Sequence, residues 1–198
     1  MAGDIGVEAV KTGMLANAAI VEAVAATVRS LDLPQLVVDP VMVAKGGDRL
    51  LEDAAIDAMR AELLPLAHVV TPNIPEAEVL AVMQIHSLED MKEAGRRILR
   101  LGPRVVLVKG GHLHGPESID VVCTKAGATE FRGPRIVTPH THGTGCTLAS
   151  AIAANLVRGR NALDAIAAAR RYVEGAIRNA PGLGGGHGPL SHFWRGVY

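Results

Sequence analysis

Short apolar runs alternate along this chain with longer segments of helical period. The runs are rich in β-branched residues and are bounded by turn-forming residues, which is typical of strands. The predicted strands are AVKTGML from Ala9, QLVVDP from Gln35, HVVTP from His68, RVVLVKG from Arg104 and IDVVCT from Ile119. Most of them are apolar throughout, as buried parallel strands are, so the pattern predicts an α/β fold.

The segments between and after these runs have apolar residues at helical spacing or begin with helix-capping pairs. In chain order these signals are Ile20, Val24, Val28 and Leu31; the pair Ser87 and Asp90; Leu148, Ile152 and Leu156; and the pair Asn161 and Asp164. No repeat, low-complexity tract or linker divides the chain. We therefore expect one domain over residues 1–198.

Composition and charge exclude several classes of partner. The chain has 198 residues, and its 20 Lys and Arg balance its 20 Asp and Glu, so no global field favours nucleic acid or a charged membrane. The longest apolar stretches, such as residues 54–66 and 148–156, are too short or too interrupted to cross a bilayer. Two cysteines and no recognisable leader indicate a reducing, cytoplasmic location.

The most unusual stretch is THGTGCT, from Thr141 to Thr147. Gly143 and Gly145 let the backbone approach a ligand closely, and a helix that starts near Thr144 points free N–H groups at an anion. A helix start also favours the thiolate form of a cysteine, which makes Cys146 a candidate base or nucleophile. The alternative is a tight turn capped by Thr144, with Cys146 as a small buried filler.

Four further candidates follow predicted strands. Asp39 lies in VVDPVMVAKGG, Asn73 and Glu76 lie in TPNIPEAE, and Lys109 lies in VKGGH. Because open α/β sheets bind ligands at the carboxyl ends of their strands, these residues together indicate a phosphate site, with Asp39 and Glu76 as candidate Mg²⁺ ligands. Each also has a structural alternative. Lys109 can be a surface lysine, Asn73 and Glu76 can cap a helix, and Asp39 can accept hydrogen bonds from a turn.

His140 and His142 stand close to Cys146 in the sequence, which leaves open a cysteine-histidine hydrolase. A loop histidine is more often a local hydrogen-bonding residue. No CxxC, HExxH or other dense ligand motif is present, so zinc is not expected.

The motifs KTGML, VVDPVMVAKGG, TPNIPEAEVL, VLVKGGH, THGTGCT and GHGPLSHF, in this order, resemble those of the hydroxymethylpyrimidine/phosphomethylpyrimidine kinases of thiamine biosynthesis. The resemblance covers nearly the whole chain. It implies a ribokinase-like three-layer sandwich with a mostly parallel central sheet flanked by helices. It also implies MgATP-dependent phosphorylation of the pyrimidine alcohol and then of its monophosphate, by a homodimer.

The resemblance also implies roles for single residues. Cys146 takes the position of the general base, and Gly143, Thr144 and Gly145 take that of the anion hole. Lys109 and Asn73 correspond to ATP-binding positions, Asp39 and Glu76 to the magnesium region, and Met14 and Val41 to apolar positions of the pyrimidine pocket.

The chain departs from this family at its front, so we expect it to be N-terminally truncated. The family's opening glycine-rich segment, with an aspartate and a glutamine that bind the pyrimidine, has no counterpart here. Two alternatives to the pyrimidine kinase therefore stay open. One is a pyridoxal kinase of the same superfamily, and the other is a non-catalytic nucleotide-binding or interaction protein.

Overall fold

A mixed β-sheet forms the centre of the molecule. The structure is a computed structural model that describes residues 2–42, 51–111 and 115–196, and in these residues six strands lie in the order β1-β2-β3-β4-β5-β6. The strands are β1 (Val10–Thr12), β2 (Leu36–Val38), β3 (Val69–Val70), β4 (Val105–Val108), β5 (Glu117–Thr124) and β6 (Gly127–Pro134). The first four run parallel, which confirms the mostly parallel α/β fold.

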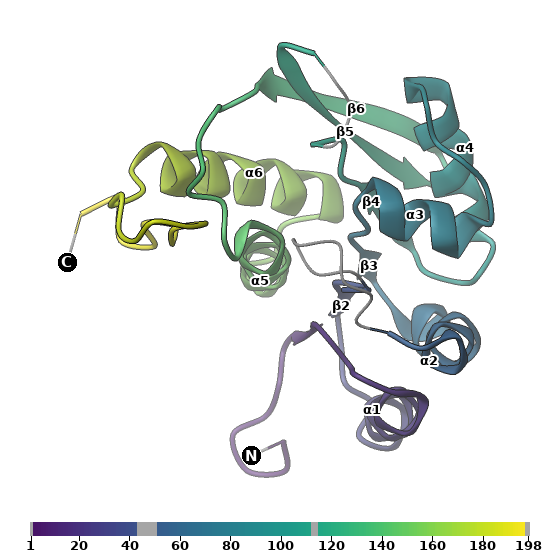
Figure 1. Cartoon of the computed structure of the whole chain (residues 1–198). Helices are drawn as coiled ribbons and strands as arrows, with labels where there is room; N and C mark the ends of the chain where they lie inside the picture. The colour runs from purple at the N-terminus through teal and green to yellow at the C-terminus, as the bar shows by residue number, and fades with distance from the viewer. Residues whose placement is uncertain (1, 43–50, 112–114, 197–198) are drawn as a thin grey trace.

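Helices cover both faces of this sheet (Figure 1). They are α1 (Ala18–Ser30), α2 (Asp53–Ala58), α3 (Ile74–Ala81), α4 (Leu88–Leu99), α5 (Thr144–Val157) and α6 (Ala162–Arg178). A π-helical turn, η1 (Met59–Leu63), and a 3₁₀ turn, η2 (Leu64–Leu66), continue α2. Ser87 and Asn161 are the N-caps of α4 and α6, as their spacing predicts. No helix in the described ranges is both long and apolar enough to span a bilayer.

Two apolar cores hold the three layers together. Successive strand residues point to opposite faces, so Val38 packs with α1–α4 while its neighbour Val37 packs with α5 and α6. Both valines are fully buried, and the same division holds along β3 and β4. The continuous apolar runs of the sequence therefore belong to strands that are covered on both faces.

The β5–β6 hairpin extends the sheet beyond its parallel part. β5 pairs antiparallel with β4, and β6 pairs antiparallel with β5, from Glu117 opposite Pro134 to Thr124 opposite Gly127. β6 was not predicted, because its sequence GATEFRGP contains no apolar run and its residues are exposed or half-buried. Figure 1 shows the hairpin arching over α6.

Residues 43–47 of the motif VVDPVMVAKGG and His112 of the motif VKGGH lie outside the described residues. The candidate site residues of these two motifs, Asp39, Val41 and Lys109, lie within them.

Candidate functional site

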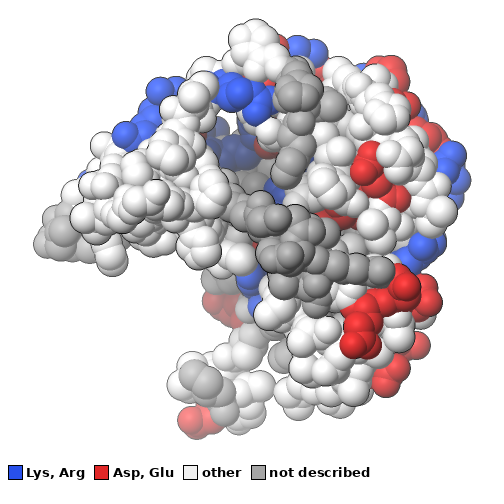
Figure 2. All heavy atoms as spheres, in the orientation of Figure 1, with Lys and Arg blue, Asp and Glu red and all other residues white. Residues whose placement is uncertain are grey.

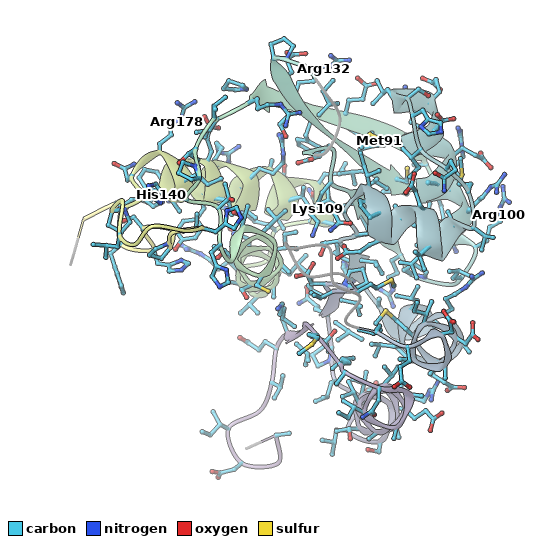
Figure 3. All side chains as sticks on the ribbon, in the orientation of Figure 1. Met91, Arg100, Lys109, Arg132, His140 and Arg178 are labelled. Carbon is cyan, nitrogen blue, oxygen red and sulfur yellow. The ribbon has the colours of Figure 1, made fainter. Side chains whose placement is uncertain are left out.

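Asp39 and Lys109 meet at the carboxyl edge of the parallel sheet. Asp39 follows β2 and Lys109 follows β4, and the Lys109 ammonium Nζ lies 3.1 Å from the Asp39 carboxylate oxygen Oδ1. The hydroxyl of Thr71, which follows β3, donates to the same oxygen at 3.2 Å. The strand ends therefore gather as the sequence predicts, and Asp39 is almost fully buried there. Figure 3 shows Lys109 near the middle of the molecule, between α3 and α5.

The first turn of α5 lies directly against this ion pair. A Cβ atom on Gly145 would lie 3.3 Å from Lys109 Nζ and 3.7 Å from Asp39 Oδ2. Gly143, the N-cap of α5, has a φ of 80°, a conformation that favours glycine. The first N–H groups of a helix have no partner within it, so this turn and the Lys109 ammonium together form a site that can hold an anion.

Thr144 supports the bend that leads into α5. Its hydroxyl donates to the carbonyl of Thr141 at 2.8 Å. This bond ties the loop to the helix start, but Gly143 and not Thr144 occupies the N-cap position. The sequence-based alternative of a turn capped by Thr144 is therefore wrong in its cap residue.

Asn73 and Glu76 form a capping box at the start of α3. The helix-capping role that the sequence left open for these two residues is therefore confirmed. Asn73 Oδ1 accepts from the Glu76 N–H at 2.9 Å, and Glu76 Oε2 accepts from the Asn73 N–H at 2.7 Å. Burial raises the pKa of Glu76 to about 7, although the Lys109 ammonium and the hydrogen bond from Asn73 both lower it. The Asp39 charge adds to the rise, so two carboxyl groups share one electrostatic environment.

This pair of carboxyl groups is chemically suited to Mg²⁺. Magnesium is usually bound by one or two carboxylates together with waters and substrate phosphates, and it does not need a complete protein cage. Within the described ranges, no three His, Cys, Asp or Glu side chains form a candidate metal cluster. Asp39 and Glu76 each offer a carboxylate at this edge that can serve such an ion.

Cys146 follows Gly145 in the first turn of α5, and its side chain is exposed. The alternative of a buried filler is therefore wrong. Cys146 lines a hollow of about 850 Å³ beside α5 and α6, whereas Thr144 and Lys109 line a second hollow of about 570 Å³. The helix start thus presents Thr144 and Cys146 to different spaces.

The two histidines near Cys146 pack against the C-terminal segment. The His142 N–H donates to the carbonyl of Gly188 at 3.2 Å, and a Cβ on Gly188 would collide with the His140 ring. Neither ring is hydrogen-bonded to Cys146 in the described part of the chain. The geometry therefore does not favour a cysteine-histidine hydrolase.

The two residues of the predicted apolar pocket lie just beyond β1 and β2. Met14 is 56% exposed, and Val41 is half-buried. The N–H of Val41 donates to the carbonyl of Asp39 at 2.9 Å, which keeps Val41 beside the ion pair. Both residues therefore lie on the strand-end side of the sheet.

The 570 Å³ hollow was not predicted from the sequence. It lies between the β5–β6 hairpin and α6, and its lining includes Lys109, Asp120, Phe131, Arg170 and Arg171. Figure 2 shows Lys and Arg atoms gathered in and around a hollow in this part of the surface. The sequence feature that could have indicated this hollow is Asp120, whose carboxylate lies inside the apolar run IDVVCT.

Comparisons with known proteins agree on one family. The phosphomethylpyrimidine kinase family matches residues 1–191. The hydroxymethylpyrimidine/phosphomethylpyrimidine kinase of Streptomyces coelicolor is 47% identical over 96% of this chain and 70% of that protein. The thiamine biosynthesis bifunctional protein ThiED of Geobacter sulfurreducens is 51% identical over 96% of this chain, which spans 39% of the length of that protein.

Solved structures show the same fold. An ADP complex of Bacillus subtilis pyridoxal kinase has a TM-score of 0.91 and 38% identity, covering 97% of this chain and 73% of that one. A phosphomethylpyrimidine kinase from Clostridium difficile has a TM-score of 0.78 and 38% identity, covering 88% of this chain and 71% of that one. The ribokinase-like three-layer architecture is therefore confirmed, and the chain belongs to the phosphomethylpyrimidine kinase family.

Proposed function

We propose that this chain transfers a phosphoryl group from ATP to hydroxymethylpyrimidine and then to its monophosphate, in thiamine biosynthesis. The observation that carries the proposal is the Lys109–Asp39 ion pair held against Gly145 at the start of α5. This arrangement offers a fixed cation and the backbone of a helix start to one anion. Family membership supplies the pyrimidine as the acceptor.

Charge builds up on the oxygens of a phosphoryl group during transfer, so donors that are already in place stabilise the transition state. In this proposal the backbone of Gly143, Thr144 and Gly145 is the anion hole, and Lys109 neutralises the phosphate oxygens. Asp39 and Glu76 would hold Mg²⁺, which would supply further positive charge to the phosphates.

The nucleotide occupies the hollow between the β5–β6 hairpin and α6, with its phosphates toward Lys109. The position of Lys109 in the lining of that hollow supports this direction. Asn73 lies next to Lys109 through a parallel β-bridge and shapes the phosphate end of the site. ADP bound to the B. subtilis relative is consistent with a nucleotide site in this fold.

The acceptor approaches from the Cys146 side. In the first transfer, Cys146 takes the proton of the substrate hydroxyl as that oxygen attacks the γ-phosphorus, and ADP leaves. In the second transfer, a phosphate oxygen of the monophosphate is the nucleophile, and ADP leaves in the same way. Met14 and Val41 contribute apolar contacts to the pyrimidine ring. The exposure of Cys146 at the helix start supports this role, because a base must reach its substrate. We also propose that the chain works as a homodimer in the cytoplasm.

The experiment is substrate-dependent ADP release by the purified chain with MgATP. Hydroxymethylpyrimidine, its monophosphate and pyridoxal are compared with a reaction that contains no acceptor. The proposal predicts release with both pyrimidines, at a higher kcat/KM than with pyridoxal.

Pyridoxal kinase activity is the second candidate, and the B. subtilis pyridoxal kinase structure favours it. A preference for pyridoxal would select this candidate. Binding of ATP without release of ADP for any acceptor would instead identify a non-catalytic nucleotide-binding protein.

A further inference from the structure

Asp120 is a buried charge that the roles above leave unused. It lies in strand β5, next to the buried residues Val121 and Val122, and is 7% exposed. Its oxygen Oδ1 accepts from the Gly110 N–H at 2.8 Å, and its oxygen Oδ2 accepts from Arg170 Nε at 2.7 Å. Burying a carboxylate is costly unless it is paired and hydrogen-bonded, and here each oxygen has a partner.

The bond to Gly110 fixes the backbone that carries Lys109. A Cβ on Gly110 would lie 1.7 Å from the carbonyl oxygen of Ile119, so only glycine fits where the strand end presses on β5. On the other side, the Lys109 N–H donates to the carbonyl of Pro72 at 2.8 Å. The two peptide groups on either side of the Lys109 Cα are therefore both held, one by Pro72 after β3 and the other by Asp120 in β5.

The hydrogen bond from Arg170 connects Asp120 to α6 as well. The Arg170 guanidinium lies over the ring of Phe131, 5.6 Å from its centroid, and Phe131 is the cross-strand partner of Asp120. Asp120, Phe131 and Arg170 all line the hollow that also contains Lys109. Helix α6 packs in turn against α5, whose first turn is the anion site.

We propose that Asp120 is a positioning residue for the nucleotide, acting through Gly110 and Arg170. It fixes the backbone of Lys109 and holds the α6 side of the hollow at a set distance from the hairpin. Because the Gly110 N–H is used by Asp120, the phosphates rely on the Lys109 side chain and on α5. The inference rests on the nucleotide site of the proposed function, and its kinetic readout rests on the proposed activity as well.

The test measures the dissociation constant of Mg²⁺-AMP-PNP by calorimetry for wild type, Asp120→Asn and Arg170→Gln. Asparagine keeps an acceptor for the Gly110 N–H but loses the charge that orients Arg170. We expect both substitutions to weaken binding about tenfold, and Arg170→Lys to recover part of the loss. The KM for MgATP should rise in parallel, while the KM for the pyrimidine changes less than about twofold.

Lys92→Gln is the matched control. Lys92 forms an ion pair of 2.9 Å with Glu130, which joins α4 to β6 outside the hollow. A purely structural role for Asp120 predicts a lower melting temperature with unchanged nucleotide affinity. That result in folded Asp120→Asn or Arg170→Gln would overturn the inference, as would an equal loss of affinity in Lys92→Gln.

Different results would contradict the proposed kinase activity and the proposed role of Asp120. Nucleotide binding by the wild type without turnover would contradict the proposed kinase activity, and the affinity ratios would still decide the role of Asp120. Absence of nucleotide binding by the wild type would contradict both proposals.

Discussion

Lys109 Nζ lies 3.1 Å from Asp39 Oδ1, although 70 positions separate the two residues in the chain. They meet because β2, β3 and β4 are adjacent parallel strands whose carboxyl ends share one edge. The side chain of Lys109 is only 16% exposed, so its ammonium is held at this edge and not free in solvent. A phosphate at the start of α5 therefore meets a cation that is already in place.

Replacing Lys109 by alanine should weaken the use of MgATP and destabilise the fold. The variant loses the cation and leaves the buried Asp39 carboxylate with the Thr71 hydroxyl, so we expect unfolding to become easier by about 2 kcal/mol. The KM for MgATP should rise at least about tenfold. Steady-state kinetics and urea unfolding measure the two effects. Lys125→Ala, at an exposed turn, is the control, and equal behaviour of the two variants would contradict this role.

Gly145→Ala separates stability from anion binding. Alanine favours a helix more than glycine does, so the free energy of unfolding should change by less than about 1 kcal/mol. The new methyl group would lie 3.3 Å from Lys109 Nζ and would narrow the anion site, so the KM for MgATP should rise about fivefold. Ser150→Ala, at an exposed position of the same helix, is the control. Unchanged kinetics in Gly145→Ala would place the phosphate elsewhere.

The sequence predicted the parallel core of the fold because β1–β4 are short apolar runs that are buried on both faces. It did not predict β6, which contains no apolar run. It also did not predict the antiparallel direction of β5, because periodicity carries no information on strand direction.

The sequence also predicted only part of the candidate site. It placed Asp39 and Lys109 at the ends of strands, but their direct contact depends on the order of the strands in the sheet. The Asp120–Arg170 pair depends on how α6 lies over the hairpin, which no local pattern encodes.

Glu76 should make the protein less stable as the pH rises. Burial raises the pKa of Glu76 from 4.5 to about 7, so between these values the folded protein binds more protons than the unfolded chain. The free energy of unfolding must then fall as the pH rises through this window, by about 3 kcal/mol from this group. Glu76→Gln keeps an acceptor for the Asn73 N–H and removes the titration.

The measurement is urea unfolding of wild type and Glu76→Gln at several pH values from 5 to 8 in metal-free buffer. The free energy of unfolding of Glu76→Gln, relative to that of the wild type, should increase as the pH rises. Parallel pH profiles would show that the Glu76 carboxyl is not the source of the effect.

The two thiols should differ strongly in reactivity. Cys123 is 1% exposed, and burial raises its pKa to about 11, whereas Cys146 is exposed at a helix start. Iodoacetamide at pH 8 should alkylate Cys146 at least about 100-fold faster than Cys123 in the folded protein. Peptide mass spectrometry gives both rates, and in denaturant they should converge. Comparable rates in the folded state would contradict the burial of Cys123.

The most direct measurement is phosphorylation of hydroxymethylpyrimidine by wild type and Cys146→Ala, with the monophosphate product quantified by mass spectrometry and AMP-PNP affinity measured in parallel. We predict product from the wild type and a kcat lowered at least about 100-fold in Cys146→Ala, with nucleotide affinity changed less than about twofold. Absence of product from the folded wild type would contradict the kinase assignment of this chain. Full turnover by Cys146→Ala would contradict the role of the thiol.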